Sequence, residues 1–355
     1  MARCKVNIID RLGDKFSGRI MLVICLVLTI AGDLTAQDLH FSQFFAAPLL
    51  TNPANTGMAG DNLRFSNIYR NQWSKIGVPF QTVSTSLDKK FILFGQPIGI
   101  GGAIIHDQSA TYNLSANEFL VSFSYSRIIN NQQISFGLQS GFIYKSYNLQ
   151  GITFGTQFDE SNQIFNSSLP TQENGLVDHL NYFDLNAGCM WQTKLQNIIP
   201  TAGVAISHIN MPLEKFSTST AGSRLPMRLT INSQVIVPVT ESIYVVPSVL
   251  YSYTPGATEF LLGGTGNYNL AKSNIQIKEL YALTMIRSNP VRNVDALILG
   301  GGISFATFNL GLTYDLNISP LHTVTNFNGA FEISLIYSGK KNIQKGAYLP
   351  CFIVK

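Results

Sequence analysis

The residues of this chain that could carry out chemistry are few, and their spacing suits it poorly. The nearest approach to a hydrolytic triad is His106-Asp107 with Ser109, residue types that suit proton transfer and nucleophilic attack. In a strand, however, neighbouring side chains point to opposite faces, so adjacency in the sequence cannot assemble that geometry. A lipase, which would need Ser, His and an Asn partner on one face, is the enzymatic alternative to a chain with no catalytic residues.

Metal and phosphate sites have no better support. None of the five histidines has the spacing to another His or Cys that a metal site requires: His40, His106, His179, His208 and His322. The glycine pairs at 101–102 and 263–264 have no following helix and lysine, so they are not phosphate loops. Asp159 and Glu160 are too few acids for a calcium site. We expect no metal and no cofactor.

The elements that would position any site are β-strands, because the chain changes character at every second residue. Phe331, Ile333 and Leu335 alternate with Glu332 and Ser334, and the same alternation recurs along much of the chain. In a soluble sandwich the apolar side of such strands forms the core. In a membrane barrel the apolar side faces lipid and the polar side faces a lumen.

The composition excludes some classes. Charged residues are 12% of the 355 residues, about half the share of a soluble domain. Without its first 36 residues the chain keeps 19 basic and 17 acidic residues, a balance that argues against nucleic-acid binding. Cys189 and Cys351 also remain, far apart in sequence, and the sequence leaves open whether they pair.

Residues 1–36 have the layout of a secretory signal peptide. A basic leader precedes the short apolar run 20–31, and the small residue Ala36 precedes the expected mature start at Gln37. The apolar run is too short for a spanning helix, although an uncleaved anchor is the alternative. Cys25 follows the bulky Ile24, which argues against lipidation.

Counting strands predicts a closed transmembrane antiparallel up-and-down β-barrel of about fourteen strands, an even number as bacterial barrels require. We expect strands near 61–70, 80–89, 98–106, 117–128, 133–146, 180–192, 199–209, 227–237, 242–253, 258–267, 275–286, 295–305, 307–317 and 328–338. The uncharged stretch 296–314 is long enough for a membrane helix. Its three adjacent glycines and its alternating flanks favour a hairpin that turns near Ala306.

Connections and charges agree with a barrel. The connections at one end include the long ones, 147–179 and 210–226, whereas those at the other end are short, as in outer-membrane barrels. Near strand ends, Arg127 and one of the adjacent Lys278 and Glu279 fall on the apolar face of their strands instead of the polar one. The other strand charges share that face and are predicted to point into the lumen: Glu118, Lys145, Asp184, Arg228, Glu259, Asp315 and Glu332.

Residues 37–60 lack strand alternation, and Pro48 and Asn52-Pro53 indicate turns. The aromatics Phe41, Phe44 and Phe45 require burial, so we predict an N-terminal plug in the barrel mouth or lumen; a disordered lead-in is the alternative. The chain then divides into a signal peptide (1–36), a plug (37–60), a barrel (61–338) and a periplasmic tail (339–355).

Several motifs resemble the PorP/SprF family, outer-membrane barrels associated with the type IX secretion system of the Bacteroidota. The matching stretches run in the order of the family: His40-Phe-Ser-Gln-Phe44 leading to Asn52-Pro53-Ala54, then Tyr69-Arg70-Asn71-Gln72-Trp73, Phe80 to Asp88, Tyr314-Asp315, Glu332-Ile-Ser-Leu335 and Pro350-Cys351. The first two motifs are the specific ones. Ala47 and the short Pro-Cys end depart from the family pattern.

The resemblance implies a non-enzymatic role in a Gram-negative outer membrane. Members are accessory barrels that assist the export or surface attachment of large proteins such as gliding adhesins, and that contact the periplasmic secretion machinery. Candidate plug and partner-contact residues are then His40, Phe41, Phe44, Phe45, Asn52, Pro53, Arg70, Asn71, Gln72 and Trp73. For Arg70 and Trp73 the structural alternative to partner contact is lumen pairing and interfacial anchoring, respectively, and it is the favoured interpretation. The alternative function is a transporter or porin-like channel for hydrophobic or small solutes.

Overall fold

The computed structural model describes residues 38–58, 63–75, 77–109, 114–148, 154–166, 168–170, 177–215, 223–270, 277–289, 293–305 and 307–339. Of these, residues 39–254 and 258–339 belong to one compact unit, and Asp38 and residues 255–257 fall outside it. The predicted signal peptide, Cys351 and the predicted tail beyond Gly339 lie outside the described residues.

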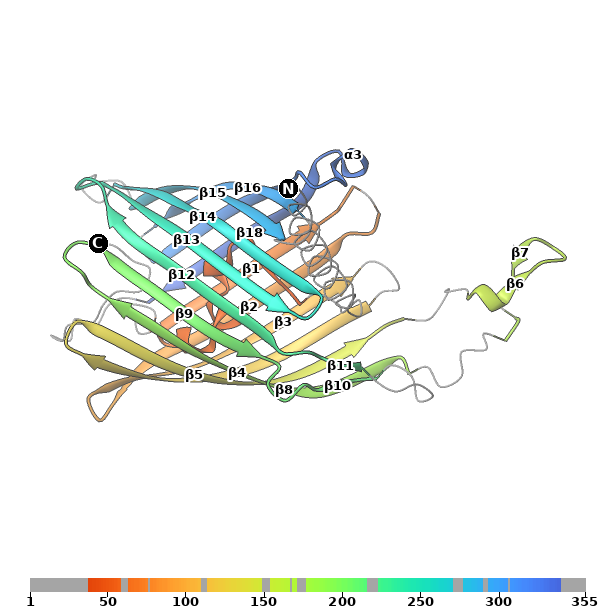
Figure 1. The fold of residues 1–355 in the computed structure, drawn as a ribbon, viewed down its shortest axis with the longest axis horizontal. Helices are drawn as coiled ribbons and strands as arrows, with labels where there is room; N and C mark the ends of the chain where they lie inside the picture. The colour runs from red at the N-terminus through yellow and green to blue at the C-terminus, as the bar shows by residue number, and fades with distance from the viewer. Residues whose placement is uncertain are drawn as a thin grey trace, which may run out of the picture. The chain divides into compact units, whose positions relative to one another are not determined.

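The main unit is a closed antiparallel barrel of fourteen strands, and its strands pair with their neighbours in the chain (Figure 1). Strand β1 pairs with both β2 and β18, which closes the cylinder. The strands are β1 (Leu63–Gln72), β2 (Phe80–Leu93), β3 (Gln96–Ser109), β4 (Leu114–Ile129), β5 (Gln132–Ser146), β8 (His179–Thr193), β9 (Ile199–Ser207), β12 (Arg228–Pro238), β13 (Ile243–Thr254), β14 (Ala257–Asn269), β15 (Glu279–Asn289), β16 (Asn293–Ser304), β17 (Phe308–Asn317) and β18 (Asn328–Ser338).

The two faces of the strands decide between the sandwich and the barrel. In β5, Leu138 is 66% exposed, whereas Ser135 on the other face is fully buried. The same inversion holds along the neighbouring strands: phenylalanines, leucines and isoleucines point out, and serines, threonines and glutamines point in. A soluble sandwich would bury its apolar face, so this surface fits a hydrocarbon surrounding.

The strand charges lie on the inward parity. Asp184, Asp315 and Glu332 are buried, and Glu118, Lys145, Arg228 and Glu259 are half-buried. At strand ends, Arg127 and Lys278 are exposed on the outward parity, and Glu279 points in. A charge facing lipid at mid-depth costs roughly 2–4 kcal/mol, whereas a charge at a strand end can reach the head groups.

The connections sort by length, as expected. At one end, which we call the long-loop end, lie the connections 73–79, 147–178, 208–227 and 318–327. At the other, the short-turn end, β2–β3 and β4–β5 are joined by two-residue turns, Phe94–Gly95 and Asn130–Asn131. The connection 270–278 is an exception, because it is longer than the other turns of the short-turn end.

Strand ends and loops differ in detail from the sequence prediction. Strand β2 continues to Leu93 rather than ending at 89, because β3 pairs with it up to Gln96. The two long loops contain two-stranded hairpins, β6 (Phe158–Asp159) with β7 (Ile164–Phe165) and β10 (Leu213–Glu214) with β11 (Ser223–Arg224). A short helix, α3 (His322–Thr325), lies in the last long connection.

The stretch 296–314 forms the β16–β17 hairpin, so the helical alternative is wrong for it. Among the described residues, no helix has the length and hydropathy needed to cross a bilayer.

Residues 39–58 of the predicted plug form a chain of short turns that lies inside the barrel, in red in Figure 1. It contains η1 (Phe44–Ala46), α2 (Pro48–Thr51) and η2 (Pro53–Asn55). Pro48 and Pro53 each stand at the first helical position, which their fixed φ favours. The Asn52 side chain caps η2 by accepting a hydrogen bond from Ala54 N at 2.9 Å. We call residues 39–58 the inner segment.

Candidate functional site

The first anchor of the inner segment is a buried charge cluster. The backbone N–H groups of Ser42 and Gln43 donate to the two carboxylate oxygens of Glu332, at 2.7 and 2.9 Å. The Ser42 hydroxyl donates to Asp315 at 2.8 Å. Arg70 joins both acids, with Nη1 2.5 Å from Glu332 Oε1 and Nη2 3.2 Å from Asp315 Oδ2. Residues more than 240 positions apart in the chain therefore meet at one point.

A second arginine balances the cluster. Arg287 Nη1 lies 2.8 Å from Asp315 Oδ2 and 3.3 Å from the Ser42 hydroxyl. Two arginines thus face two carboxylates, and all four side chains are buried. Removal of one member from such a cluster leaves an uncompensated buried charge, which costs about 3–5 kcal/mol. The cluster fixes the start of the inner segment against β1, β15, β17 and β18.

The second anchor is aromatic. Phe44 packs into an apolar cluster of inward-facing side chains from β13 to β16: Leu250, Leu261, Leu283, Met285 and Ile298. Phe41 packs with Ala46, Ala47 and Ile68, and Phe45 lies against both clusters. This part of the inward-facing wall is apolar, and it gives Phe44 a matching surface inside the barrel.

The third anchor is a part of the barrel wall that carries only small inward-facing residues and lies against the turn Asn52–Gly57. One small residue from each of five neighbouring strands stands in cross-strand register: Gly99 (β3), Ser124 (β4), Gly137 (β5), Gly188 (β8) and Ala205 (β9). We call this row the small-residue belt. An added methyl group would overlap Thr56 at Gly99, the backbone of Pro53 and Ala54 at Gly137, and the Asn52 side chain at Gly188. The belt lets the turn approach the wall closely.

Hydrogen bonds hold the turn on the belt. Asn52 Nδ2 donates to the carbonyl oxygens of Cys189 and Val204, both at 3.2 Å. The Ser124 hydroxyl donates to Thr56 O at 2.5 Å. Gly57 N donates to Asp88 Oδ2 at 2.7 Å, from a backbone with φ +67° that glycine adopts at no steric cost.

Arg64 completes this anchor from β1. Its Nε lies 2.8 Å from Asp88 Oδ1, and its Nη2 donates to Asn55 O at 2.9 Å. The ion pair therefore links the first two strands to the end of the inner segment.

Together the contacts of the inner segment reach every strand of the barrel. The residues reached by hydrogen bonds, close approach or a shared apolar cluster are Ser66 (β1), Asp88 (β2), Gly99 (β3), Ser124 (β4), Gln139 (β5), Cys189 (β8), Val204 (β9), Arg228 (β12), Leu250 (β13), Leu261 (β14), Arg287 (β15), Ile298 (β16), Asp315 (β17) and Glu332 (β18). The segment thus ties the whole circumference together.

His40 adds a titratable group to this interior. Its Nε2 lies 4.0 Å from Glu259 Oε1, and Arg228 Nη2 lies 3.9 Å from Glu259 Oε2. Glu259 raises the pKa of His40, but burial and the cations Arg70, Arg287 and Arg228 together outweigh it, so this pKa falls from 6.5 to about 4. His40 is therefore neutral at neutral pH.

The other predicted lumen charges lie nearer the long-loop end, and two of them, Lys145 and Asp184, pair with loop residues. Lys145 Nζ lies 2.5 Å from Glu214 Oε1, which also accepts from Tyr182 OH at 2.9 Å. Asp184 Oδ1 lies 2.9 Å from His208 Nδ1. Glu118 is half-buried on the inward face of β4.

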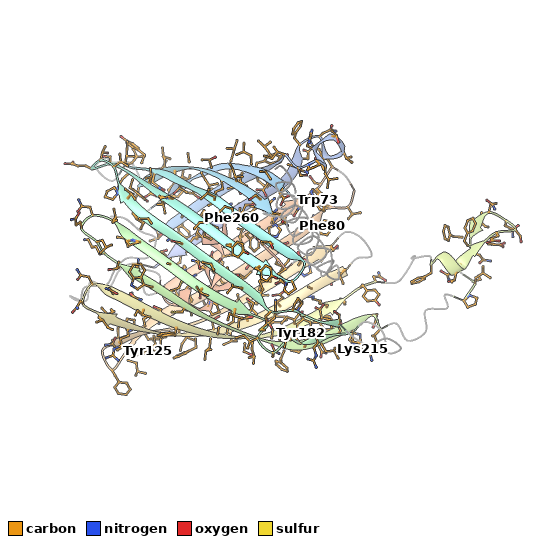
Figure 2. The ribbon with its side chains drawn as sticks, in the orientation of Figure 1. Trp73, Phe80, Tyr125, Tyr182, Lys215 and Phe260 are labelled. Atoms are coloured by element: carbon orange, nitrogen blue, oxygen red, sulfur yellow. The ribbon has the colours of Figure 1, made fainter. Side chains whose placement is uncertain are left out.

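The end of β1 carries the other candidate contact residues. Gln72 Oε1 accepts from Arg70 Nη2 at 3.3 Å, and Asn71 Nδ2 donates to Tyr69 OH at 3.1 Å. Trp73 is exposed at the long-loop end with φ +58°, and its ring meets Phe80 edge to face at 5.4 Å (Figure 2). Arg70 therefore serves the interior, whereas Trp73 is open to the surroundings of the barrel.

No catalytic geometry forms around the suggested triad. His106 is exposed and its Nδ1 lies 2.8 Å from Asn117 Oδ1, whereas Asp107 on the opposite face accepts from the Thr82 hydroxyl. Within the described residues, no three His, Cys, Asp or Glu side chains gather as metal ligands.

Sequence reasoning missed several members of the site: Ser42, Gln43, Arg64, Asp88, Arg287 and the small-residue belt. Arg64 and Arg287 share the parity of their polar neighbours and could have been added by the rule that found Arg228. The belt glycines alternate with apolar residues too, but their common level appears only after the strands are placed in register.

Comparison with known proteins identifies the family. The sequence model described as type IX secretion system membrane protein PorP/SprF matches residues 34–337. No curated protein matches the chain.

Solved structures similar to this chain include outer-membrane barrels. CdiB from Acinetobacter baumannii is 10% identical with a TM-score of 0.46, over 78% of this chain and 60% of that one. The CymD monoaromatic hydrocarbon channel is 10% identical with a TM-score of 0.48, over 83% and 93%. The toluene transporter TbuX of Ralstonia pickettii is 10% identical with a TM-score of 0.47, over 83% and 93%. The chain spans less than two thirds of the length of the CdiB chain.

The family match covers most of the chain, and the closed barrel with its apolar exterior agrees with a membrane protein. Family and fold together point to a secretion or transport component of the outer membrane rather than to an enzyme. The chain belongs to the PorP/SprF family of type IX secretion system membrane proteins.

Proposed function

We propose that this protein is a non-enzymatic scaffold of the type IX secretion system. In this role it assists the export or surface attachment of large cargo proteins, such as gliding adhesins. Its signal peptide is removed near Ala36, and the barrel then sits in outer-membrane lipid with its short-turn end in the periplasm.

The observation that carries this proposal is the inner segment. Residues 39–58 contact all fourteen strands through hydrogen bonds to buried charged residues, close backbone approach and apolar packing. Opening a solute path along this interior would break the hydrogen bonds of Ser42 and Gln43 to the buried Glu332 and would expose Phe44, so a permanent channel is disfavoured. A barrel braced in this way is suited to presenting its two rims to other proteins.

Each rim then has a partner in this proposal. The long-loop end holds cargo, and Trp73 with the neighbouring Asn71 and Gln72 contributes to that contact, because exposed aromatic residues on rigid scaffolds are frequent interface hot spots. The short-turn end meets the periplasmic secretion machinery.

Deletion of the gene tests the proposal. We expect cargo adhesin to disappear from the cell surface, as measured by antibody labelling of intact cells, and to return with the full chain supplied in trans. Normal surface labelling in the deletion strain would overturn the proposal. Solute uptake by liposomes that contain the purified protein would instead support the transporter alternative, with the Glu332→Gln variant as a comparison for displacement of the inner segment.

A further inference from the structure

The inner segment runs through the lumen in one direction, and its first residues lie at the long-loop end. Leu39 O accepts a hydrogen bond from Arg228 Nη1 at 3.3 Å, and Arg228 is the first residue of β12 after the long connection 208–227. The backbone N–H of Ser42 donates to Glu332 on β18, which begins after the long connection 318–327. In Figure 1 this end is on the right, where β10, β11 and α3 are labelled.

The last residues of the segment lie toward the short-turn end. Asn55 O accepts a hydrogen bond at 2.9 Å from Nη2 of Arg64, which is near the start of β1. Gly57 N donates to Asp88 at 2.7 Å in the part of β2 that leads to the β2–β3 turn. The chain therefore crosses the lumen from the long-loop end to the short-turn end and returns along β1.

A second part of the wall fixes the level of Leu39 in the lumen. The Leu39 side chain packs against Ala103, Ile105 and Leu120. Ile105 lies in the half of β3 that leads to Ser109 at the long-loop end. Contacts with β3 and β12 therefore agree that the inner segment begins in the long-loop half of the barrel.

The chain that precedes Leu39 is too short to reach the other end. Removal of the signal peptide near Ala36 leaves two residues before Leu39, which span at most about 7 Å. Strand β12 has 11 residues from Arg228 to Pro238. That strand measures about 33 Å, or roughly 25 Å along the barrel axis at the usual strand tilt. Even after the length of the Arg228 side chain is subtracted, the short-turn rim lies beyond the reach of residues 37 and 38.

We infer that the mature chain begins at the cell exterior, with its N-terminus open at the long-loop mouth, where cargo and other surface proteins can reach it. The end of β18 lies at the opposite rim, because Ser338 pairs with Arg64. The N-terminus and the end of the last strand therefore face opposite sides of the membrane. This inference rests on the proposed function, which removes the signal peptide near Ala36 and places the short-turn end in the periplasm.

The test inserts a short peptide epitope between Gln37 and Asp38 of the full-length protein. Antibody binding is measured on intact cells, whose outer membrane excludes antibodies, and on permeabilised cells. We expect intact cells to bind as much antibody as permeabilised cells do. Binding only after permeabilisation would overturn the inference, and so would absence of binding in both preparations.

Two control insertions separate this inference from the proposed function. The epitope between Ser161 and Asn162, in the β6–β7 turn of the long-loop end, should be bound on intact cells. The epitope between Glu241 and Ser242, in the β12–β13 turn of the short-turn end, should be bound only after permeabilisation. If both controls behave in this way and the N-terminal epitope is hidden, the inference fails alone and the proposed function stands. Reversed controls would overturn the proposed orientation, and the inference with it.

A disulfide shows whether the tagged segment is still in place. Gln43 Oε1 accepts a hydrogen bond from the Ser334 hydroxyl at 2.7 Å. With Cys189→Ser and Cys351→Ser as the background, Gln43→Cys and Ser334→Cys should form a disulfide in the tagged and the untagged protein alike. Antibody binding on intact cells without that disulfide would come from a displaced segment and would overturn the inference.

Discussion

Replacement of Gly137 by alanine should detach the inner segment from the barrel wall. The new methyl group would lie 2.5 Å from the carbonyl oxygen of Pro53 and would overlap the backbone of Ala54. Those atoms cannot retreat independently, because Asn52 and Thr56 hold the turn by hydrogen bonds to the wall on either side. Overpacking of this kind costs typically 1–3 kcal/mol. We expect the free energy of unfolding to fall by about that amount.

The measurement is urea unfolding of the refolded barrel in detergent, together with protease sensitivity of residues 39–58. Gly266→Ala is the matched control, because a methyl group there meets nothing within 4 Å, and its stability should change little. A second comparison introduces Gly137→Ala into a variant that lacks residues 39–58. The substitution should be nearly neutral in that background, since the clash partner is absent. An equal cost in both backgrounds, or no cost in the full chain, would refute the close-packed belt.

Two further predictions concern the interior charges. Glu332→Gln should destabilise the barrel by about 3–5 kcal/mol and increase the protease sensitivity of residues 39–58, because two buried arginines would then face the single carboxylate of Asp315. The less buried pair of Lys145 and Glu214 is the comparison, and Lys145→Ala should cost less than about 1 kcal/mol. The folded chain holds the His40 pKa at about 4, below its ordinary 6.5, so the unfolded chain binds the proton more readily. The free energy of unfolding should therefore fall as pH decreases from about 6.5 to 4. In His40→Gln the free energy of unfolding should change less with pH over that range, and an identical pH dependence in both proteins would contradict the assignment.

The barrel could be predicted closely because its signal is local. The period of two along β5 or β18 depends only on which side of a strand meets lipid, and a charge such as Glu332 reports that side without any knowledge of its partner. The same logic located all fourteen strands, with boundaries shifted by a few residues. It could not give the true end of β2, because the extension to Leu93 depends on pairing with β3.

The anchors of the inner segment lie beyond that local signal. The sequence by itself determined that Phe41, Phe44 and Phe45 need burial and that Asp315 and Glu332 face inward. Only closure of the barrel brought Ser42 to Glu332 and set Gly99, Gly137 and Gly188 in one row, because those contacts depend on register across strands far apart in the chain. The apolar wall around Phe44 was likewise decided by the tertiary structure, since an inward leucine looks the same in sequence whether it meets water or an aromatic ring.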